Sequence, residues 1–299
     1  KMKKRIIRIA SLALVILGMV SCSDEQETAL RPQDAKSIPM TFLVSHPGQA
    51  SRATETNFEK NDKIGLYVAD AKAQLEIGGN LVNNEALTYD GSKWAAARAL
   101  YWDKGTYTAY AYYPYIENVS SITDQSFSVA LDQRVAKTAT SLGGYEASDL
   151  LFATSKNISA SASPINLTFK HIMSKLKIRL VKGEDFEGEM PATADVYIHN
   201  TVPTATVDLQ AGVATRYVKG TRHTIVARQD DEASYSSIIV PQRIDNRMPL
   251  IEVVMNGVSY LYESKFQFKP GTEHLVNLII SDNPDQVKIE IGGEIQNWQ

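Results

Sequence analysis

Apolar and polar residues alternate one for one in many short stretches of this sequence, and this pattern constrains the fold more than any other feature. Successive side chains of a β-strand point to opposite faces, so such alternation gives a strand one buried face. Clear examples are residues 38–44, 64–68, 107–113 and 286–291. After residue 21, no window of about 11 residues keeps a convincing helical period. The sequence therefore predicts an all-β chain.

The strand-like stretches are short and turn residues separate them, which is typical of β-sandwiches. Fourteen Tyr and eight Phe, with abundant Thr, Val and Ile, favour strands as well. We expect two β-sandwich domains in tandem with Greek-key-like connections, over residues 53–163 and 164–299. The boundary lies near the Ser- and Ala-rich residues 160–164. In the tyrosine-rich strand 107–115, alternation predicts one face in the core and the other at a sheet surface.

The first 21 residues have the layout of a secretory signal. Five basic residues precede or enter an apolar run that ends at Met19-Val20-Ser21-Cys22. That run is shorter than the roughly 20 residues that span a bilayer, so a transmembrane helix is disfavoured. Met19 to Cys22 stands where lipoprotein signals carry Leu, a small or apolar residue, a small residue and Cys. We therefore predict cleavage between Ser21 and Cys22, and lipid (palmitate) on Cys22.

Residues 22–52 are predicted to hold a tether and the first strand. Three carboxylates follow Cys22 within five residues, and they either form a plain hydrophilic tether or direct the lipoprotein to the cell surface. Removing residues 1–21 leaves 26 Lys and Arg against 34 Asp and Glu. So acidic a chain, with no basic patch in its sequence, is a poor nucleic-acid binder.

No arrangement of residues in the sequence points to catalysis, a metal or a cofactor. The five His fall in no zinc-binding spacing, and the sole Cys is assigned to lipid. There is no Gly-x-Ser-x-Gly elbow and no phosphate-binding Gly-rich loop followed by Lys. His171 follows an apolar strand and is expected to be structural. We do not expect an enzyme.

Several segments after Cys22 occur in a telling order. Residues 61–67 read Asn-Asp-Lys-Ile-Gly-Leu-Tyr, residues 107–114 form the tyrosine-rich strand ending at Pro114, and residues 167–176 read Leu-Thr-Phe-Lys-His-Ile-Met-Ser-Lys-Leu. Residues 51–58, 149–153, 239–242 and 268–272 complete the series. Together they resemble the fimbrillins, subunits of type V pili from Bacteroidales-type bacteria. The family's pattern has Gly where Asn61 stands.

The resemblance implies a maturation sequence. A fimbrillin precursor reaches the outer membrane as a lipoprotein, and an Arg-specific protease then cuts in the loop after the first strand. Losing that strand opens a groove, which an extended strand from another subunit fills. Here the implied cut falls between Arg52 and Ala53, in a polar loop of the kind where proteolysis concentrates.

Two strands of this chain match those roles. The removed strand offers Ile38, Met40, Phe42 and Val44, and the candidate donor strand, residues 285–299, offers Val287, Ile289, Ile291 and Ile295. Burying four such side chains stabilises by on the order of 6–12 kcal/mol. The implied product is an adhesive fimbrium of like or unlike fimbrillin subunits, which would contact a host or bacterial surface ligand.

Simpler interpretations stay open. Arg52 can be an ordinary surface residue, and residues 285–299 can pair as the last strand of their own domain. An uncut chain would remain a lipidated surface protein, acting as a basal anchor or as a module that binds glycan or host protein.

Overall fold

The structure, a computed structural model, describes residues 38–47, 57–296 and 298. Nearly all the regular structure in this part of the chain is β-strand, with one short helix, α1 (Gly144–Ser148), and a 3-10 turn, η2 (Pro284–Gln286). The prediction of an all-β chain is confirmed. Residues 21, 22, 52 and 53, which carry the predicted processing sites, lie outside the described residues.

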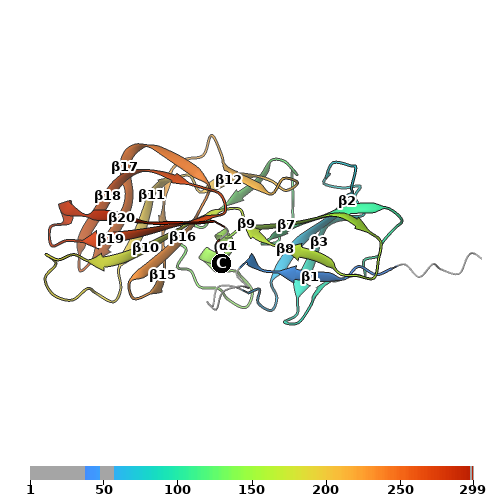
Figure 1. Ribbon diagram of the computed structural model, residues 1–299, viewed down its shortest axis with the longest axis horizontal. Helices are drawn as coiled ribbons and strands as arrows, with labels where there is room; N and C mark the ends of the chain where they lie inside the picture. The colour runs from blue at the N-terminus through green and yellow to red at the C-terminus, as the bar shows by residue number, and fades with distance from the viewer. Residues whose placement is uncertain (1–37, 48–56, 297, 299) are drawn as a thin grey trace, which may run out of the picture. The chain divides into compact units, whose positions relative to one another are not determined.

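A six-stranded antiparallel sheet organises the first half of the chain (Figure 1). Its strands, in spatial order, are β4 (Trp94–Ala96), β3 (Val82–Tyr89), β2 (Lys63–Asp70), β5 (Thr106–Tyr113), β7 (Leu151–Ser159) and β9 (Lys170–His171). A separate two-stranded sheet holds β1 (Phe42–Ser45) parallel to β8 (Ile165–Thr168). Side chains of β8, with Met40, share one hydrophobic cluster with the face of β2 that carries Ile64 and Leu66.

The other face of the six-stranded sheet is buried too, which corrects the expectation for the tyrosine-rich strand. Tyr110 and Tyr112 belong to a second hydrophobic cluster, together with Tyr67 of β2. Residues of the segment that follows β5, such as Ile122 and Phe127, belong to the same cluster. Neither face of β5 is therefore an open sheet surface.

Two further sheets build the second half. The five-stranded sheet has the order β15 (Arg228–Asp231), β16 (Ser234–Ile239), β10 (Ser174–Lys182), β19 (Thr272–Ile280) and β20 (Lys288–Gln296), with only the β10–β19 pair parallel. The four-stranded antiparallel sheet has the order β14 (His223–Val226), β11 (Asp195–Thr201), β17 (Gln242–Met255) and β18 (Val258–Phe268). Buried residues of both sheets meet in the second hydrophobic cluster.

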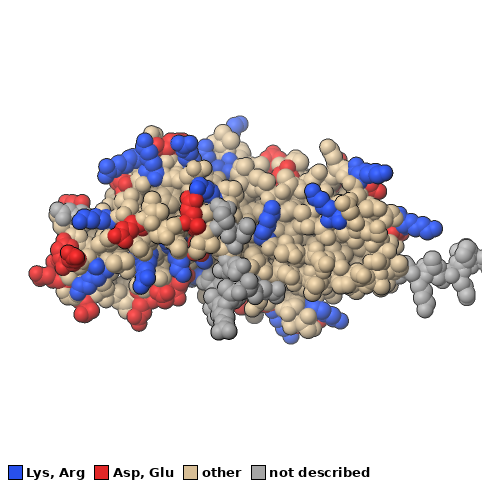
Figure 2. All heavy atoms as spheres, in the orientation of Figure 1, with Lys and Arg blue, Asp and Glu red and all other residues tan. Residues whose placement is uncertain are grey.

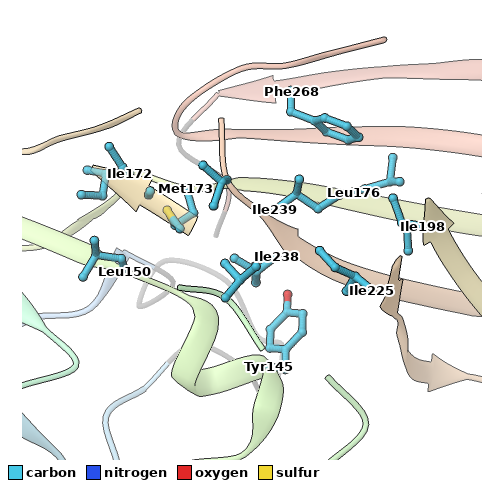
Figure 3. Close-up of a cluster of buried hydrophobic side chains, with 14 of the residues drawn as sticks. Tyr145, Leu150, Ile172, Met173, Leu176, Ile198, Ile225, Ile238, Ile239 and Phe268 are labelled. Carbon is cyan, nitrogen blue, oxygen red and sulfur yellow. The ribbon is translucent and has the colours of Figure 1, made fainter. Parts of the chain in front are cut away.

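A three-stranded sheet connects the two halves. It pairs β6 (Gln125–Ser128) with β12 (Thr204–Asp208), and β12 with β13 (Val213–Arg216). In Figure 3, Tyr145 of α1 and Leu150 lie in the same cluster as Ile238 and Ile239 of β16. The domain boundary expected near residues 160–164 thus stays a prediction, since a sheet and a hydrophobic cluster both include residues from either side of it.

Candidate functional site

The first described segment is held by main-chain hydrogen bonds to two different parts of the chain. Met40 N donates to Leu100 O and Trp102 N donates to Ile38 O, each at 2.9 Å. Farther along, Phe42↔Ile165 and Val44↔Leu167 are partners in the parallel β1–β8 pair. Ile165 N donates to Thr41 O at 2.8 Å, and Phe169 N donates to Ser45 O at 3.0 Å. Residues 38–45 therefore fill a slot between residues 100–102 and β8.

Alternation along this segment holds for three of the four apolar side chains expected on its buried face, and fails at Ile38. Met40 is buried, Phe42 and Val44 are half-buried against the first cluster, and Leu43 is 57% exposed. Ile38, at the start of the segment, is exposed. Full burial of Met40 and half-burial of Phe42 and Val44 together contribute roughly 3–6 kcal/mol. If the segment left, Ile165 and Leu167 of β8 would lose the cover of those side chains.

The surface around β1 carries little charge. Figure 2 shows Lys, Arg, Asp and Glu side chains gathered over the part of the molecule that holds β10 and β17–β19. On the same face, the surface over β1 and β8 is mostly uncharged. Recognition in the slot would therefore depend on main-chain pairing and apolar side chains, as in strand addition to a sheet.

The candidate donor strand is an edge strand of the five-stranded sheet. It pairs with β19, for example Leu278↔Ile289. Val287 and Ile289 are half-buried against the second cluster, whereas Ile291 is 74% exposed and Ile295 is exposed as well. The register shifts between Leu275↔Gly293 and Val276↔Ile291, so Gly292 forms a β-bulge. Half of the apolar set predicted for this strand thus lies open to solvent.

Beyond β20, Trp298 returns to the other half of the molecule. Its side chain is 3% exposed and stacks on His171 of β9, with ring centroids 4.0 Å apart. His171 Nδ1 lies 2.9 Å from Asp149 Oδ1, which orients the imidazole. The His46 ring, which follows β1, lies 6.2 Å from the His171 ring in an edge-on arrangement. The ends of β1 and of the C-terminal segment therefore converge on one buried histidine.

Burial changes the protonation of His46. Desolvation lowers its pKa from 6.5 to about 4, outweighing Asp149 and Asp62, which favour the charged form. The His46 ring also lies edge-on to Phe58, with centroids 4.9 Å apart. The end of β1 thus carries a neutral, packed imidazole at neutral pH.

The segment of residues 59–62 forms a turn built around a buried carboxylate. Asp62 accepts hydrogen bonds from Glu59 N and from Lys137 Nζ, both at 2.8 Å. Asn61 has φ 77°, a conformation that Gly and Asn adopt most readily, which accounts physically for Asn in place of Gly in this motif. The turn fixes the start of β2, at Lys63, on the C-terminal side of the predicted cut at Arg52.

Sequence reasoning assigns His171 a structural role and does not single out His46 or Trp298. Only spatial proximity joins these three residues, and no spacing in the sequence signals it. Among the described residues, no three His, Cys, Asp or Glu side chains are grouped so that they could hold a metal ion. Within the same residues, no helix has both the length and the apolar character needed to cross a membrane.

Comparison with known proteins gives one family. The sequence profile of the fimbrillin-like family matches residues 51–298. The "Putative fimbrium tip subunit Fim1C" of Bacteroides ovatus is 30% identical over 129 residues, which are 40% of this chain and 23% of that protein. The chain therefore corresponds to less than a quarter of the length of this relative.

Solved structures share the fold at low sequence identity. A "putative cell adhesion protein" from Bacteroides ovatus has a TM-score of 0.66 at 18% identity, with 88% of this chain and 98% of that chain covered. One of the same description from Bacteroides uniformis has a TM-score of 0.66 at 20% identity, covering 87% and 98%. The tip fimbrial protein Mfa3 from Porphyromonas gingivalis has a TM-score of 0.51 at 7% identity, covering 86% and 98%.

Proposed function

This chain belongs to the fimbrillin-like family, and from that premise we propose that it is a fimbrial subunit that assembles by strand exchange on the cell surface. It is exported as a lipoprotein through Cys22 and is moored in the outer membrane. An Arg-specific protease then cuts between Arg52 and Ala53. The mature subunit begins at Ala53 and joins other fimbrillin subunits in an adhesive fimbrium.

The observation that carries this proposal is the way residues 38–45 sit in their slot. The segment contributes main-chain hydrogen bonds on both sides and apolar side chains on one face. Any extended strand with the same alternation of apolar residues could make the same main-chain hydrogen bonds and fill the same apolar positions. A strand with residues such as Ile289 and Ile291 fits that requirement.

Cleavage alone would not free the slot, because the hydrogen bonds and apolar contacts of β1 do not depend on the chain continuing past residue 52. The cut changes exchange from an intramolecular to an intermolecular competition. Before the cut, β1 is covalently attached and therefore rebinds its own slot at a high effective concentration. After the cut, β1 can diffuse away once a strand of another subunit has displaced it.

A reversible crosslink across β1 and β8 tests this step. Leu43 and Asn166 are register partners whose side chains are exposed, so Leu43→Cys with Asn166→Cys on a Cys22→Ser background places two thiols on neighbouring strands. The spacing of paired strands, about 5 Å, suits a disulfide. Oxidised protein should be cut by an Arg-specific protease yet stay monomeric, and reduction should then start polymerisation.

Size-exclusion chromatography and electron microscopy detect the polymers, and the single Leu43→Cys variant is the control. Polymers that form equally under oxidising and reducing conditions would show that β1 need not leave. Cleaved, reduced protein that stays monomeric would rule out self-assembly by this route.

A second function is favoured by the environment of β20. That strand is paired with β19, and Trp298 is buried on His171, so the C-terminal segment is bound within its own chain. A subunit that keeps β20 and Trp298 in these positions accepts a strand without donating β20, and ends a fimbrium or binds a surface ligand at its tip. Mixing cleaved protein with a strand-donating fimbrillin would then yield short capped assemblies, while the protein alone would remain monomeric.

A further inference from the structure

The four-stranded sheet has one apolar face in the core and one open face that carries a polar cluster. Val196 and Ile198 of β11 and Ile251 of β17 are buried in the second hydrophobic cluster. Alternation therefore puts Tyr197, His199 and Glu252 on the opposite face. This open face belongs to a sheet that contains neither β1 nor β20.

Four side chains on this face form a continuous hydrogen-bonded chain. His199 Nδ1 lies 2.9 Å from Thr224 Oγ1, and His199 Nε2 lies 2.8 Å from Glu252 Oε2. Ser259 Oγ donates to Glu252 Oε1 at 2.6 Å. The Tyr197 ring stacks on the His199 ring with centroids 6.2 Å apart. These contacts fix the polar groups before any ligand arrives, which lowers the entropy cost of binding.

The Glu252 carboxylate, which belongs to this hydrogen-bonded series, stays ionised. The hydrogen bond from Ser259, followed by that from His199, lowers the pKa of Glu252 below its ordinary value. Each carboxylate oxygen keeps a further lone pair, so Glu252 can accept another hydrogen bond from a ligand hydroxyl.

The polar cluster borders a hollow of about 290 Å³. Besides His199, Thr224 and Glu252, its lining includes Asn200, Arg222, His223, Pro249 and Leu261. Asn200 has φ 61° next to the bulge of β11 and donates through Nδ2 to Pro249 O at 2.8 Å. The volume is near the lower end of the range for small-molecule sites, and it suits one sugar ring better than a large ligand.

Arg222 is the cationic member of the lining. Its Nη1 lies 3.3 Å from Met248 Sδ, and no described carboxylate forms an ion pair with it. The nearby arginines of β17 differ, since Arg243 pairs with Asp245 and Arg247 with Glu263. Arg222 therefore offers a planar set of donors to a carboxylate brought by a ligand.

We propose that this hollow binds a carboxylated sugar ring, such as a uronic or sialic acid of a surface glycan. Arg222 pairs with the sugar carboxylate, Glu252 accepts from a ring hydroxyl, and Pro249 and Leu261 contact the C–H face of the ring. A neutral sugar would leave Arg222 unused. A phosphate or nucleic-acid backbone would bring repeated negative charge against Glu252 without the hydroxyl donors that it requires.

The experiment is titration calorimetry on the full folded chain with the methyl glycosides of glucuronic acid and N-acetylneuraminic acid, with methyl glucoside and acetate as comparisons. At least one acidic sugar should bind at least about tenfold more tightly than the glucoside or acetate. Methyl glucoside lacks the carboxylate and so loses the charge-assisted hydrogen bond to Arg222, and acetate lacks the hydroxyl groups that contact Glu252. Arg222→Ala and Glu252→Gln should each weaken that binding by about tenfold or more.

The matched control is Arg243→Ala, which removes an exposed arginine of the same sheet outside the hollow and should leave affinity unchanged. Thermal melting checks that each variant is folded. Equal affinity for acidic and neutral sugars, acetate binding that matches the acidic sugars, affinity that survives Arg222→Ala, or no binding at millimolar sugar would each overturn the proposal. Strand exchange is measured separately by polymer formation, so either proposal can fail without the other.

Discussion

The indole of Trp298 stacks on the imidazole of His171 at an interplanar angle of 18°. His171 lies in β9 of the six-stranded sheet, whereas Trp298 follows β20 of the five-stranded sheet. The contact therefore ties the end of the described chain to the half of the molecule that contains β1.

Trp298→Ala should loosen β20, because that edge strand would lose its anchor beyond Gln296. We expect the free energy of unfolding to fall by roughly 3 kcal/mol, as for other buried Trp truncations. Amide hydrogen exchange in residues 288–296 should speed up, while exchange in β10 stays slow. Trp298→Phe, which keeps a ring on His171, is the control and should retain most of the protection. Unchanged exchange in Trp298→Ala would mean that the stack does not hold β20.

Acidification should destabilise the uncut chain through His46. Its pKa is about 4 in the folded chain, against 6.5 for an unperturbed histidine, so between these values the unfolded chain binds a proton and the folded chain does not. The stability contributed by keeping His46 neutral is complete above pH 6.5 and is lost as pH falls towards 4. The loss should be about 1–3 kcal/mol.

Urea unfolding at about pH 7 and at about pH 4.5, on either side of the unperturbed histidine pKa, measures this loss. His46→Gln removes the titrating group, so the difference between the two pH values should shrink in that variant. Should His46→Gln retain the full pH dependence, other groups would be responsible.

Gln133 should be a strong contributor to stability because it is completely buried and satisfies main-chain groups of β16. Its Nε2 donates to Ile238 O at 2.7 Å, and its Oε1 accepts from Ile238 N at 2.8 Å. Gln133→Ala leaves those groups without partners and should cost about 2–4 kcal/mol by chemical unfolding. The exposed Gln267→Ala is the matched control and should cost under about 0.5 kcal/mol. Similar values for the two variants would contradict this role.

Gly65 has a steric role that the motif around it does not reveal. A Cβ at this position would lie 2.3 Å from Cζ of Tyr112, the partner residue on β5. Gly65→Ala should displace the Tyr112 ring, whose hydroxyl is hydrogen-bonded to Asn84 Oδ1 and Ile116 O, and should lower the free energy of unfolding by about 1–3 kcal/mol. Thermal melting measures this loss, and Gly78→Ala is the control. A Cβ at Gly78 has no neighbouring atom within 4 Å, so that variant should be nearly as stable as the unmodified protein. A neutral Gly65→Ala would show that Tyr112 can move without cost.

Local alternation is enough to locate most strands. It predicts strands over residues 64–68 and 107–113, which lie within β2 (Lys63–Asp70) and β5 (Thr106–Tyr113), and over residues 286–291, where β20 covers Lys288–Gln296. The burial of both faces of β5 could not be predicted, because Tyr110 and Tyr112 share a cluster with Ile122 and Phe127, and alternation within β5 does not show where the following segment packs. The pairing of β6 with β12 and the stack of Trp298 on His171 are long-range contacts that no periodicity encodes.

The candidate site likewise has features that the sequence predicts and features that it does not. Alternation predicts the apolar face of residues 38–44 in part, since Met40 is buried and Phe42 and Val44 are half-buried, whereas Ile38 is exposed. For β20 the same pattern predicts one uniform face, whereas the bulge at Gly292 is accompanied by exposure of Ile291. A glycine pair signals such a bulge only once the partner strand is known.

The most direct test of the central claim is the N-terminus of the subunit in fimbriae purified from the surface of cells that make this protein. The proposed maturation predicts Ala53 as the first residue, with residues 38–45 absent, by N-terminal sequencing and mass spectrometry. A lipid-blocked Cys22, with residues 38–45 still attached in the assembled fimbriae, would contradict it.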